Sequence, residues 1–558
     1  MQKLNLKIKQ IGPMIIIAAL TAIYCAGFID PISRTQSHEY RMWIAIIAVF
    51  MIVMRYFKEL LFKHLSKYKQ AAVINIYMAI LVITSTFGVF NYYQFDKDVI
   101  KGMDDYTDIA YYYLNSKYLD ELGYFNFYSA MLYADLTYKN RHASKIVRYR
   151  DLRDYEVKST HVAFEHGLEI KEHQFTKKRW EQFTHDVDWF LARKTTANLQ
   201  GNFFVDHGYN PPPTWAVAGG ILANIAPVES VKMIAVVDVL FVIAMLIGVI
   251  WAFGFETMLY IALFFLFTFS GRWPVLTHSL LRFDWSALLV LSICAFKKER
   301  WVLAGALLSY AALTRIFPAI FFFAWGVVAL KEIIKYRSVP VRHIKVAAGA
   351  AVMALVLIVT ALAMYGSETF EESAHNLIMH NESFSSHRVG LGDLLVYDGE
   401  TSRDDIRAFG GMGKKELMVQ ALQPELRLTG ILMLLFTGFY IWRTDKKIHN
   451  LIYLAIIPFY CITNPQINYY YVRMTLVLWH ASNINKPLHK AGLILLFSVD
   501  IATQYVFLQH VPRYTVTVTT SIGMAIYFSV LIAVMIYEIS RTFFKSKKNI
   551  QPGSPVHT

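Results

Sequence analysis

The sequence has few charged residues and very few cysteines. Only 17% of its 558 residues are charged, whereas 55% are hydrophobic and the mean hydropathy is +0.36. Soluble domains carry about a quarter charged residues, so this composition excludes a soluble enzyme and a disordered chain. The three cysteines, Cys25, Cys294 and Cys461, lie in apolar stretches without ligand spacing, which indicates neither a disulfide scaffold nor a metal framework.

The hydrophobic residues form blocks of about 15 to 24 residues, the length of a helix that crosses a lipid bilayer. We therefore predict an all-α polytopic membrane protein with about 12 to 14 transmembrane helices. Full-length spans are predicted at 11–29, 42–57, 71–90, 231–252, 279–296, 343–366, 426–443, 491–510 and 519–540. Shorter apolar segments lie at 214–227, 257–270, 301–314, 316–332, 450–463 and 470–483. The first block lacks a small-residue cleavage site, so we expect it to be a retained helix.

Basic residues outnumber acidic residues by 55 to 41, but they do not indicate a nucleic-acid partner. They gather between the apolar blocks, where such clusters mark the cytoplasmic side. The clusters are 3–9, 55–69, 297–300, 331–345, 443–447, 486–490 and 541–548. Their alternation predicts that residues 91–212, the loop 367–425 and residues 464–468 lie on the outer side.

This topology divides the chain into four parts. They are N-terminal transmembrane helices (1–90), an extracytoplasmic helical segment (91–213), a transmembrane bundle (214–540) that carries the outer loop, and a basic cytoplasmic tail (541–558). In the outer segment, helical periodicity at 104–138 and at 173–196 predicts helices that lie on the membrane surface and pack on the bundle. The hairpin 301–332 is too short for two full spans and contains Pro318. Because broken helices need a covering of protein or a wet cavity, we expect a cavity open to the outer face.

Three carboxylates at the start of the outer segment form the first candidate site: Asp104, Asp105 and Asp108. Such a cluster can bind a cation or leave one aspartate as a general base. The alternative is that these residues cap the helix that follows, where acidic side chains are favoured.

A second candidate site is the return segment, which we define as residues 206–213, where the chain re-enters the bilayer. Its prolines favour the start of a new helix. His207, Tyr209 and Asn210 would then lie at the rim of the cavity. The alternative is a turn whose polar groups satisfy only the local backbone.

Charged residues inside or beside the spans supply further candidates, since such charges usually face a partner or a cavity. Arg282 and Asp284 lie at the outer end of span 279–296, and Arg315 lies at the apex of the hairpin 301–332. A buried arginine there would suit an anion such as a lipid phosphate. The alternatives are a structural ion pair for Arg282 and Asp284, and snorkelling to headgroups for Arg315.

The remaining candidates come from the outer loop and the last third of the chain. His380, His387 and Arg388 lie in the loop 367–425, and Arg473 follows a run of tyrosines. All of the candidates fall on the outer side of the predicted topology. Together they predict a cationic cavity with an aromatic rim, which suits an anionic lipid substrate and a polyhydroxyl partner.

The order of these motifs resembles that of the GT-C superfamily of membrane glycosyltransferases, in particular the bacterial polyprenol-phosphate-mannose-dependent mannosyltransferases and an uncharacterised bacterial subgroup. The resemblance covers about residues 71–485. It is carried by Asp108 with Tyr111–Tyr113, by Gly123-Tyr124 and Tyr128, by Tyr209-Asn210-Pro211-Pro212, by Ala304-Gly305 with Arg315-Ile316-Phe317-Pro318, and by Asn464-Pro465 with Tyr469–Tyr471. The chain departs from the family in having Arg315 at the lysine position, a longer outer segment and two additional N-terminal spans.

The resemblance implies a GT-C-like bundle and an inverting glycosyltransferase without a cofactor, although a divalent metal is possible. A sugar, mannose or another hexose or pentose, would leave a polyprenyl phosphate and join a glycan or glycolipid acceptor. Asp108 would be the general base, with Asp105 as the alternate. The expected location is a bacterial inner membrane with the site on the periplasmic side. A lipid or solute transporter using Asp238, Asp284 and Asp500, and a polysaccharide polymerase or ligase, remain as alternatives.

Overall fold

The computed structural model describes residues 21, 30–62, 65–96, 107–272, 279–382, 384–399 and 413–548. The predicted first helix at 11–29, apart from Thr21, and the acidic residues Asp104 and Asp105 lie outside the described residues. Eight described helices are long and apolar enough to cross a membrane by length and composition. They include α2 (Arg34–Phe62), α3 (Lys67–Tyr92), α11 (Val231–Phe253), α15 (Phe322–Tyr336), α16 (Val341–Tyr365), α20 (Gln423–Arg443), α23 (Pro487–Leu508) and α24 (Arg513–Lys548). The prediction of an all-α polytopic membrane protein is confirmed at this level.

Shorter helices fill the space between the long ones. They are α10 (Pro213–Ile225), α12 (Phe255–Phe267), α13 (Asp284–Lys297), α14 (Trp301–Thr314), α21 (Ile456–Ile462) and α22 (Met474–Ser482). Single tight turns are η3 (Val228–Ser230), η4 (Phe269–Arg272), η5 (Phe317–Phe321), η7 (Ile448–Asn450), η8 (Ile452–Ala455) and η9 (Ile467–Arg473). Nearly all residues of α12 and α22 are buried, as expected for short helices covered by their neighbours.

Two predicted spans differ from the structure. The span 279–296 begins as a helix only at Asp284, because the chain turns at Leu281, whose φ of +48° no helix allows. The second arm of the hairpin 301–332 was predicted to be too short, but η5 and α15 together give an apolar segment of 20 residues, Phe317–Tyr336. Pro318 lies in its first turn, where a proline is tolerated.

The long helices pack around one extended apolar core. α2 lies along α23, α23 packs on α24, and α14 packs on both α13 and α16. One face of each long helix remains exposed and apolar; on α16 the exposed residues include Val352, Leu355 and Val359. Such a surface is typical of helices that face lipid.

The outer segment is more compact than predicted. It contains α4 (Thr107–Lys117), α5 (Leu119–Leu122), α6 (Phe127–Tyr138), α7 (Thr160–His173), α8 (Lys177–Leu191), α9 (Thr196–Asn198), the turns η1 (Ala143–Lys145) and η2 (Leu199–Phe203), and the antiparallel strands β1 (Arg148–Arg150) and β2 (Val157–Ser159). These elements share a second apolar core with α10. His173, expected to begin a helix, ends α7, and α8 starts after Thr176, whose hydroxyl accepts a hydrogen bond from the backbone N–H of Arg179.

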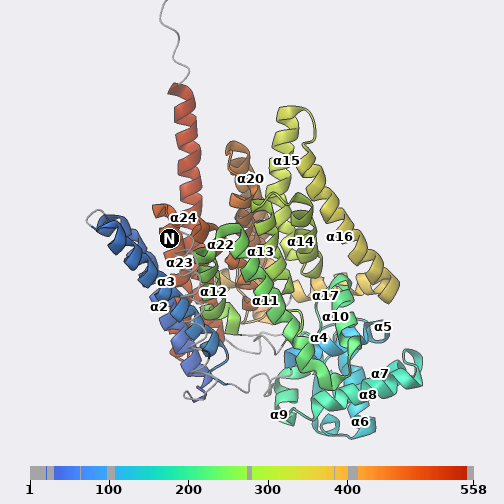
Figure 1. Cartoon of the computed structure of the whole chain (residues 1–558). Coiled ribbons are helices and arrows are strands. Elements are labelled where there is room, and N and C mark those ends of the chain that lie inside the picture. The colour runs from blue at the N-terminus through green and yellow to red at the C-terminus, as the bar shows by residue number, and fades with distance from the viewer. Residues whose placement is uncertain are drawn as a thin grey trace, which may run out of the picture.

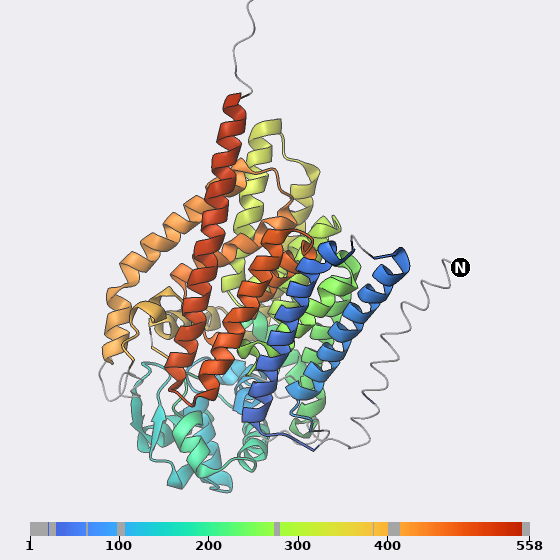
Figure 2. The same cartoon turned by 90° about the vertical axis from the view of Figure 1, so that its left-hand side faces the viewer.

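The outer loop 367–425 also contains helices: α17 (Glu368–Glu382), α18 (Leu391–Leu395) and α19 (Lys414–Ala421). A small apolar cluster that includes Phe384, Val396 and Tyr514 packs this loop against α24. The predicted tail begins as helix, since α24 continues to Lys548. Figures 1 and 2 show α4–α8 gathered at one end of the molecule, whereas α24 and the connection between α15 and α16 extend toward the other end.

The basic clusters lie close to one another at that other end. Lys331 pairs with Asp445 at 2.9 Å, and Lys447 pairs with Glu299 at 3.7 Å. Arg55 donates a hydrogen bond to Asn485 Oδ1 at 2.8 Å. Three clusters that the sequence assigns to one side of the membrane are therefore joined by direct contacts, and a fourth contacts the residue that precedes the cluster 486–490. The helices α4, α10 and α17, which carry or adjoin several of the candidates, lie toward the opposite end with the rest of the outer segment (Figure 1).

Candidate functional site

Asp108 and Arg282 form an ion pair where the outer segment meets the bundle. Asp108 lies in the first turn of α4, where a carboxylate is favoured by the helix dipole. Its Oδ2 is 3.3 Å from Arg282 Nε, and both residues are only 8% exposed. The guanidinium also donates a hydrogen bond to the hydroxyl of Tyr112, and its carbon lies 4.5 Å from the centre of that ring. Asp108 therefore pairs with an arginine of the bundle in addition to occupying the first turn of α4.

A buried carboxylate on α11 holds Arg282 in place. Asp238 is 0% exposed and accepts hydrogen bonds from the backbone N–H groups of Arg282 and Phe283, at 3.1 and 3.0 Å. The hydroxyl of Ser279 donates a third hydrogen bond to it at 3.2 Å. These bonds fix the turn that precedes α13. Asp238 therefore positions Arg282 beside Asp108.

Arg315 reaches the same tyrosine from the end of α14. Its guanidinium carbon lies 5.7 Å from the ring centre of Tyr112 and 5.3 Å from that of Trp215. It donates hydrogen bonds to the carbonyls of Thr314 and Leu281, at 2.8 and 3.4 Å, while its Nε is buried without a hydrogen-bond partner. Two arginines thus approach one tyrosine that follows Asp108 by one helical turn.

Asp284 adds a second carboxylate next to these cations. It is fully buried, and its Oδ2 accepts a hydrogen bond from the hydroxyl of Tyr310 at 3.1 Å. Its Oδ1 has no hydrogen-bond partner among the described residues. Arg315 and Arg282 both act on it electrostatically. Buried polar atoms without a hydrogen-bond partner are rare in folded proteins, and a bound ligand is one explanation for them.

The return segment meets the outer loop beside this centre. Asn376 of α17 donates hydrogen bonds to the carbonyl of Tyr209 at 3.0 Å and to Asn210 Oδ1 at 3.2 Å. The ring of His207 lies 5.4 Å from that of His380, also on α17. Burial lowers the pKa of His380 to about 3, and Arg388 adds to the shift. This imidazole is therefore neutral at physiological pH and can both donate and accept hydrogen bonds.

Tyr209 links the two clusters. Its ring lies 6.1 Å from that of Tyr112 and 5.9 Å from that of Trp215. Its hydroxyl is buried and forms no hydrogen bond within the part of the chain that the structure describes. A tyrosine hydroxyl in such a position usually finds a partner, so this group is available to a ligand.

The other loop residues have structural contacts. Arg388 donates a hydrogen bond to the carbonyl of His380 and forms a backbone bridge with Gln466. The carbonyl of His387 accepts a hydrogen bond from the backbone N–H of Ile467 at 2.8 Å, and its ring lies 2.7 Å from a guanidinium nitrogen of Arg513. These contacts tie the loop to residues 464–468, as the shared outer location predicts.

Arg473 lies apart from the ion pair of Asp108. It pairs with Asp500 at 2.9 Å and donates to the hydroxyls of Thr268 and Ser270, at 2.9 and 3.3 Å. Both members of the pair are at most 1% exposed. The structure thus brings Asp108, Arg282, Arg315 and Asp284 to one region and assigns Arg473 to another.

Several aromatic residues of the site were not among the predicted ligands. Tyr112, Trp215 and Tyr310 contact the charged groups directly, and the ring of Tyr469 lies 5.8 Å from the guanidinium carbon of Arg282. Tyr112 follows Asp108 by four residues and so shares its helix face. That spacing was visible in the sequence, whereas the other three contacts depend on tertiary packing.

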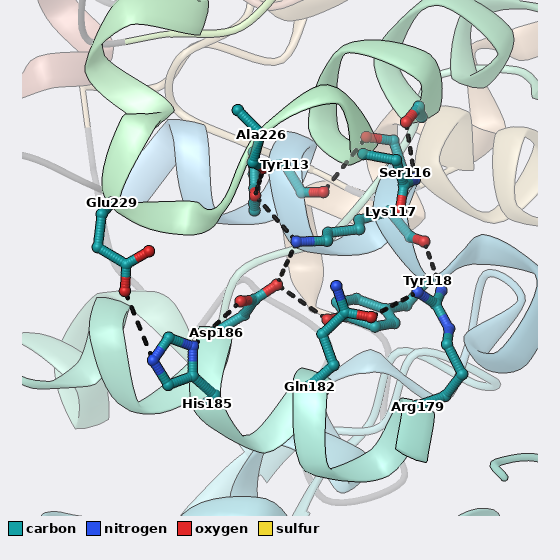
Figure 3. Close-up of polar contacts among 12 residues, drawn as sticks. Tyr113, Ser116, Lys117, Tyr118, Arg179, Gln182, His185, Asp186, Ala226 and Glu229 are labelled. Carbon is teal, nitrogen blue, oxygen red and sulfur yellow. Dashed lines mark hydrogen bonds and ion pairs between the residues drawn. The ribbon is translucent and has the colours of Figure 1, made fainter.

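A buried ion pair anchors the far end of α4 (Figure 3). Lys117 Nζ lies 2.7 Å from Asp186 Oδ2 of α8, and both side chains are at most 3% exposed. The hydroxyl of Tyr118 donates to the same carboxylate at 2.8 Å, and Lys117 also donates to the hydroxyl of Tyr113 at 3.1 Å. Arg179 of α8 adds a hydrogen bond to the carbonyl of Lys117 at 2.9 Å. This network fixes the helix that carries Asp108.

Within the described residues, no group of three or more His, Cys, Asp or Glu side chains could hold a metal ion. The charged groups of the site are instead three carboxylates, Asp108, Asp238 and Asp284, and two arginines, Arg282 and Arg315. Comparisons with family models, curated proteins and solved structures each found no match to this chain. The function is therefore inferred from the geometry of the site.

Proposed function

We propose that this protein is an inverting glycosyltransferase that transfers a sugar from a polyprenyl phosphate to a glycan or glycolipid acceptor at the outer face of a bacterial inner membrane. The observation that supports it most is the approach of Asp108, Arg282 and Arg315 to one tyrosine, Tyr112. A base and two cations within one buried region are the groups that such a transfer requires.

In the proposed reaction, Asp108 accepts the proton of an acceptor hydroxyl while that oxygen attacks the anomeric carbon of the donor sugar. The bond between this carbon and the phosphate oxygen breaks, and the electron pair leaves with the lipid phosphate. Attack from the face opposite the leaving group inverts the configuration. The charge that develops on the phosphate would be stabilised by Arg315, whose Nε forms no hydrogen bond with any described residue.

Arg282 has a different part in this proposal. Its ion pair with Asp108 holds the carboxylate close to the guanidinium, and its backbone is fixed by Asp238. A catalytic group held by such secondary contacts requires little reorganisation during the reaction. We therefore assign Arg282 mainly to positioning the base.

The acceptor would approach along the return segment. His207, Asn210 and His380 offer hydrogen-bonding groups there, and the Tyr209 hydroxyl is buried without a partner. Hydroxyls of a sugar both donate and accept hydrogen bonds, which matches amide, imidazole and phenol groups. A polymerase or ligase acting on lipid-linked sugars would use the same chemistry and would differ in product length.

The transporter alternative receives less support from the contacts. Asp500 is paired with Arg473, and Asp238 accepts three hydrogen bonds that fix a turn. Residues that exchange protons during transport need a partner that changes between states, and these two carboxylates serve the fold. Among the described residues, Asp284 and Asp500 each keep one oxygen without a hydrogen bond, whereas both oxygens of Asp238 accept hydrogen bonds.

The test compares Asp108→Asn with Asp120→Asn, an exposed aspartate of α5. Membranes containing each variant are incubated with radiolabelled polyprenyl-phosphate mannose, glucose or arabinose, and released polyprenyl phosphate is measured. We expect release to fall at least 100-fold, by about 10² to 10⁴ for loss of a general base, in Asp108→Asn and to persist in Asp120→Asn. Release by Asp108→Asn at the wild-type rate would refute the assignment of the base. If the wild type uses none of these donors but moves a labelled solute into liposomes, the transferase proposal is wrong.

A further inference from the structure

A further buried arginine, Arg41, lies outside the candidate site and forms no ion pair with a carboxylate of the described residues. Arg41 lies in the second turn of α2 and is 3% exposed. Its Nε and Nη1 atoms form no hydrogen bond, and no carboxylate of the described residues forms an ion pair with it. An isolated charge in a low-dielectric interior is costly, so proteins rarely retain one without a function.

The surroundings of Arg41 are aromatic and polar. Its guanidinium carbon lies 5.3 Å from the ring centre of Tyr92 on α3, and Tyr471 of η9 acts on it electrostatically. The rings of Tyr92 and Tyr471 flank that of Phe265, at 5.8 and 5.0 Å. These rings come from three different elements, so the arginine lies where α2 and α3 join the rest of the bundle.

The charges nearby do not compensate Arg41. Asp500 also acts on Tyr471, but its Oδ1 already binds Arg473, the hydroxyl of Thr268 and the backbone N–H of Phe269. The strongest electrostatic effects on Arg41 come from Tyr92, Tyr471 and a further cation, Arg34, and none of these groups is a carboxylate. The positive charge of Arg41 is therefore not balanced among the described residues, and an anionic ligand would balance it.

We propose that Arg41 binds the phosphate group of an anionic ligand between the α2–α3 hairpin and the bundle. The planar guanidinium matches the oxygens of a phosphate better than those of a solvated halide. This site is independent of the proposed transfer reaction and is not joined to Asp108 by any contact described above.

The test uses the purified full-length chain in detergent and native mass spectrometry to count bound molecules of dioleoyl phosphatidic acid, with inorganic phosphate in a parallel arm. Arg41→Gln should lower the affinity for the phosphate compound at least tenfold, since a hydrogen bond to a charged group contributes about 1.5–3 kcal/mol. Arg41→Lys, which keeps the charge but loses the planar guanidinium, should retain part of the binding. Arg34→Gln, which removes an exposed arginine of the same helix, should bind as the wild type does.

The two arms identify the source of the phosphate. Binding of phosphatidic acid alone indicates a lipid headgroup, and equal binding of inorganic phosphate indicates a soluble anion; both support the site. The proposal is wrong if Arg41→Gln binds both compounds as the wild type does, or if Arg34→Gln loses as much.

A second measurement does not depend on binding. Arg41→Met removes a charge without a partner, so in lipid-free detergent it should unfold at the same temperature as the wild type or higher. A clear decrease would show that the charge is compensated within the protein and would contradict the proposal. This readout also separates the site from the proposed function, because neither experiment measures sugar transfer.

Discussion

Gly305 of α14 and Gly349 of α16 form the crossing point of the two helices. A Cβ atom on Gly305 would collide with the carbonyl oxygen of Val346, and one on Gly349 would collide with that of Val302. Each glycine therefore faces the backbone of the other helix, a contact that small residues permit between membrane helices. Because α14 ends next to Arg315, this crossing also sets the position of that guanidinium.

Substitution at the crossing should separate the helices. We expect Gly305→Val to lower the unfolding temperature in detergent and to reduce transfer, since overpacking costs about 1–3 kcal/mol and moves Arg315. Gly326→Ala of α15 is the matched control, because its Cβ would meet no atom within 4 Å. It should leave the unfolding temperature unchanged or slightly higher. If Gly305→Val unfolds at the wild-type temperature, α14 and α16 do not pack as closely as the contacts of Gly305 indicate.

Arg315 should contribute to donor binding. Removal of its guanidinium in Arg315→Ala takes away the cation proposed to face the lipid phosphate, so we expect KM for the donor to rise about tenfold or more, the loss of one charged hydrogen bond. Arg315→Lys should recover part of the effect. Arg300→Ala, an exposed arginine at the other end of α14, should have the wild-type KM. Equal KM values for Arg315→Ala and the wild type would remove Arg315 from the donor site.

The ion pair of Lys117 and Asp186 should be essential for the outer segment. Lys117→Met leaves a buried carboxylate without its cation, which typically costs about 3–5 kcal/mol, and we expect a large fall in the unfolding temperature. The double variant Lys117→Met/Asp186→Leu removes both charges and should recover much of the loss. Thermal unfolding followed by tryptophan fluorescence measures both effects. If the double variant unfolds at the same temperature as Lys117→Met or lower, the pair does not stabilise the outer segment by compensating charge.

The loop residue Asp393 should make stability depend on pH. Burial raises the pKa of its carboxyl to about 7, against the opposing effect of Arg388, whereas an unfolded aspartate has a pKa of about 4. Between these values the folded protein holds a proton that the unfolded chain releases. This contribution to the free energy of unfolding is therefore fully present below about pH 4 and decreases by up to about 1.4 kcal/mol per pH unit until about pH 7.

The measurement compares the wild type with Asp393→Asn, whose amide cannot titrate. From pH 4 to pH 7 the unfolding temperature of the wild type should fall relative to that of Asp393→Asn. The comparison cancels the opposite trend of His380, whose lowered pKa is present in both proteins. A constant difference across this range would contradict a raised pKa for Asp393.

Hydrophobic block length predicted most of the bundle. The span 343–366 corresponds to α16 (Val341–Tyr365), and the span 231–252 corresponds to α11 (Val231–Phe253). The start of α10 at Pro213 follows from the fixed φ of proline. These features depend on residues that are close in sequence, and for that reason the sequence was sufficient.

The details of the site depended on residues far apart in the sequence. The turn at Leu281 is held by Asp238, more than forty residues earlier, so the pattern of apolar residues alone predicted an uninterrupted span. Asp108 and Arg282 could be placed on the same side of the membrane from the basic clusters, but their ion pair is a property of packing. The pairing of Arg473 with Asp500 is also a property of tertiary packing, and it places this arginine apart from the ion pair of Asp108.

Asp238 also connects the site to the surrounding bilayer. It belongs to α11, whose outward residues Met233, Leu240 and Ile247 are exposed and apolar. Helices of this kind tilt to match the thickness of the hydrocarbon layer. Since the carboxylate of Asp238 is bonded to the backbone at Arg282, a tilt of α11 would shift the guanidinium relative to the carboxylate of Asp108. Acyl-chain length would then tune the geometry of the charged centre without any molecule entering it.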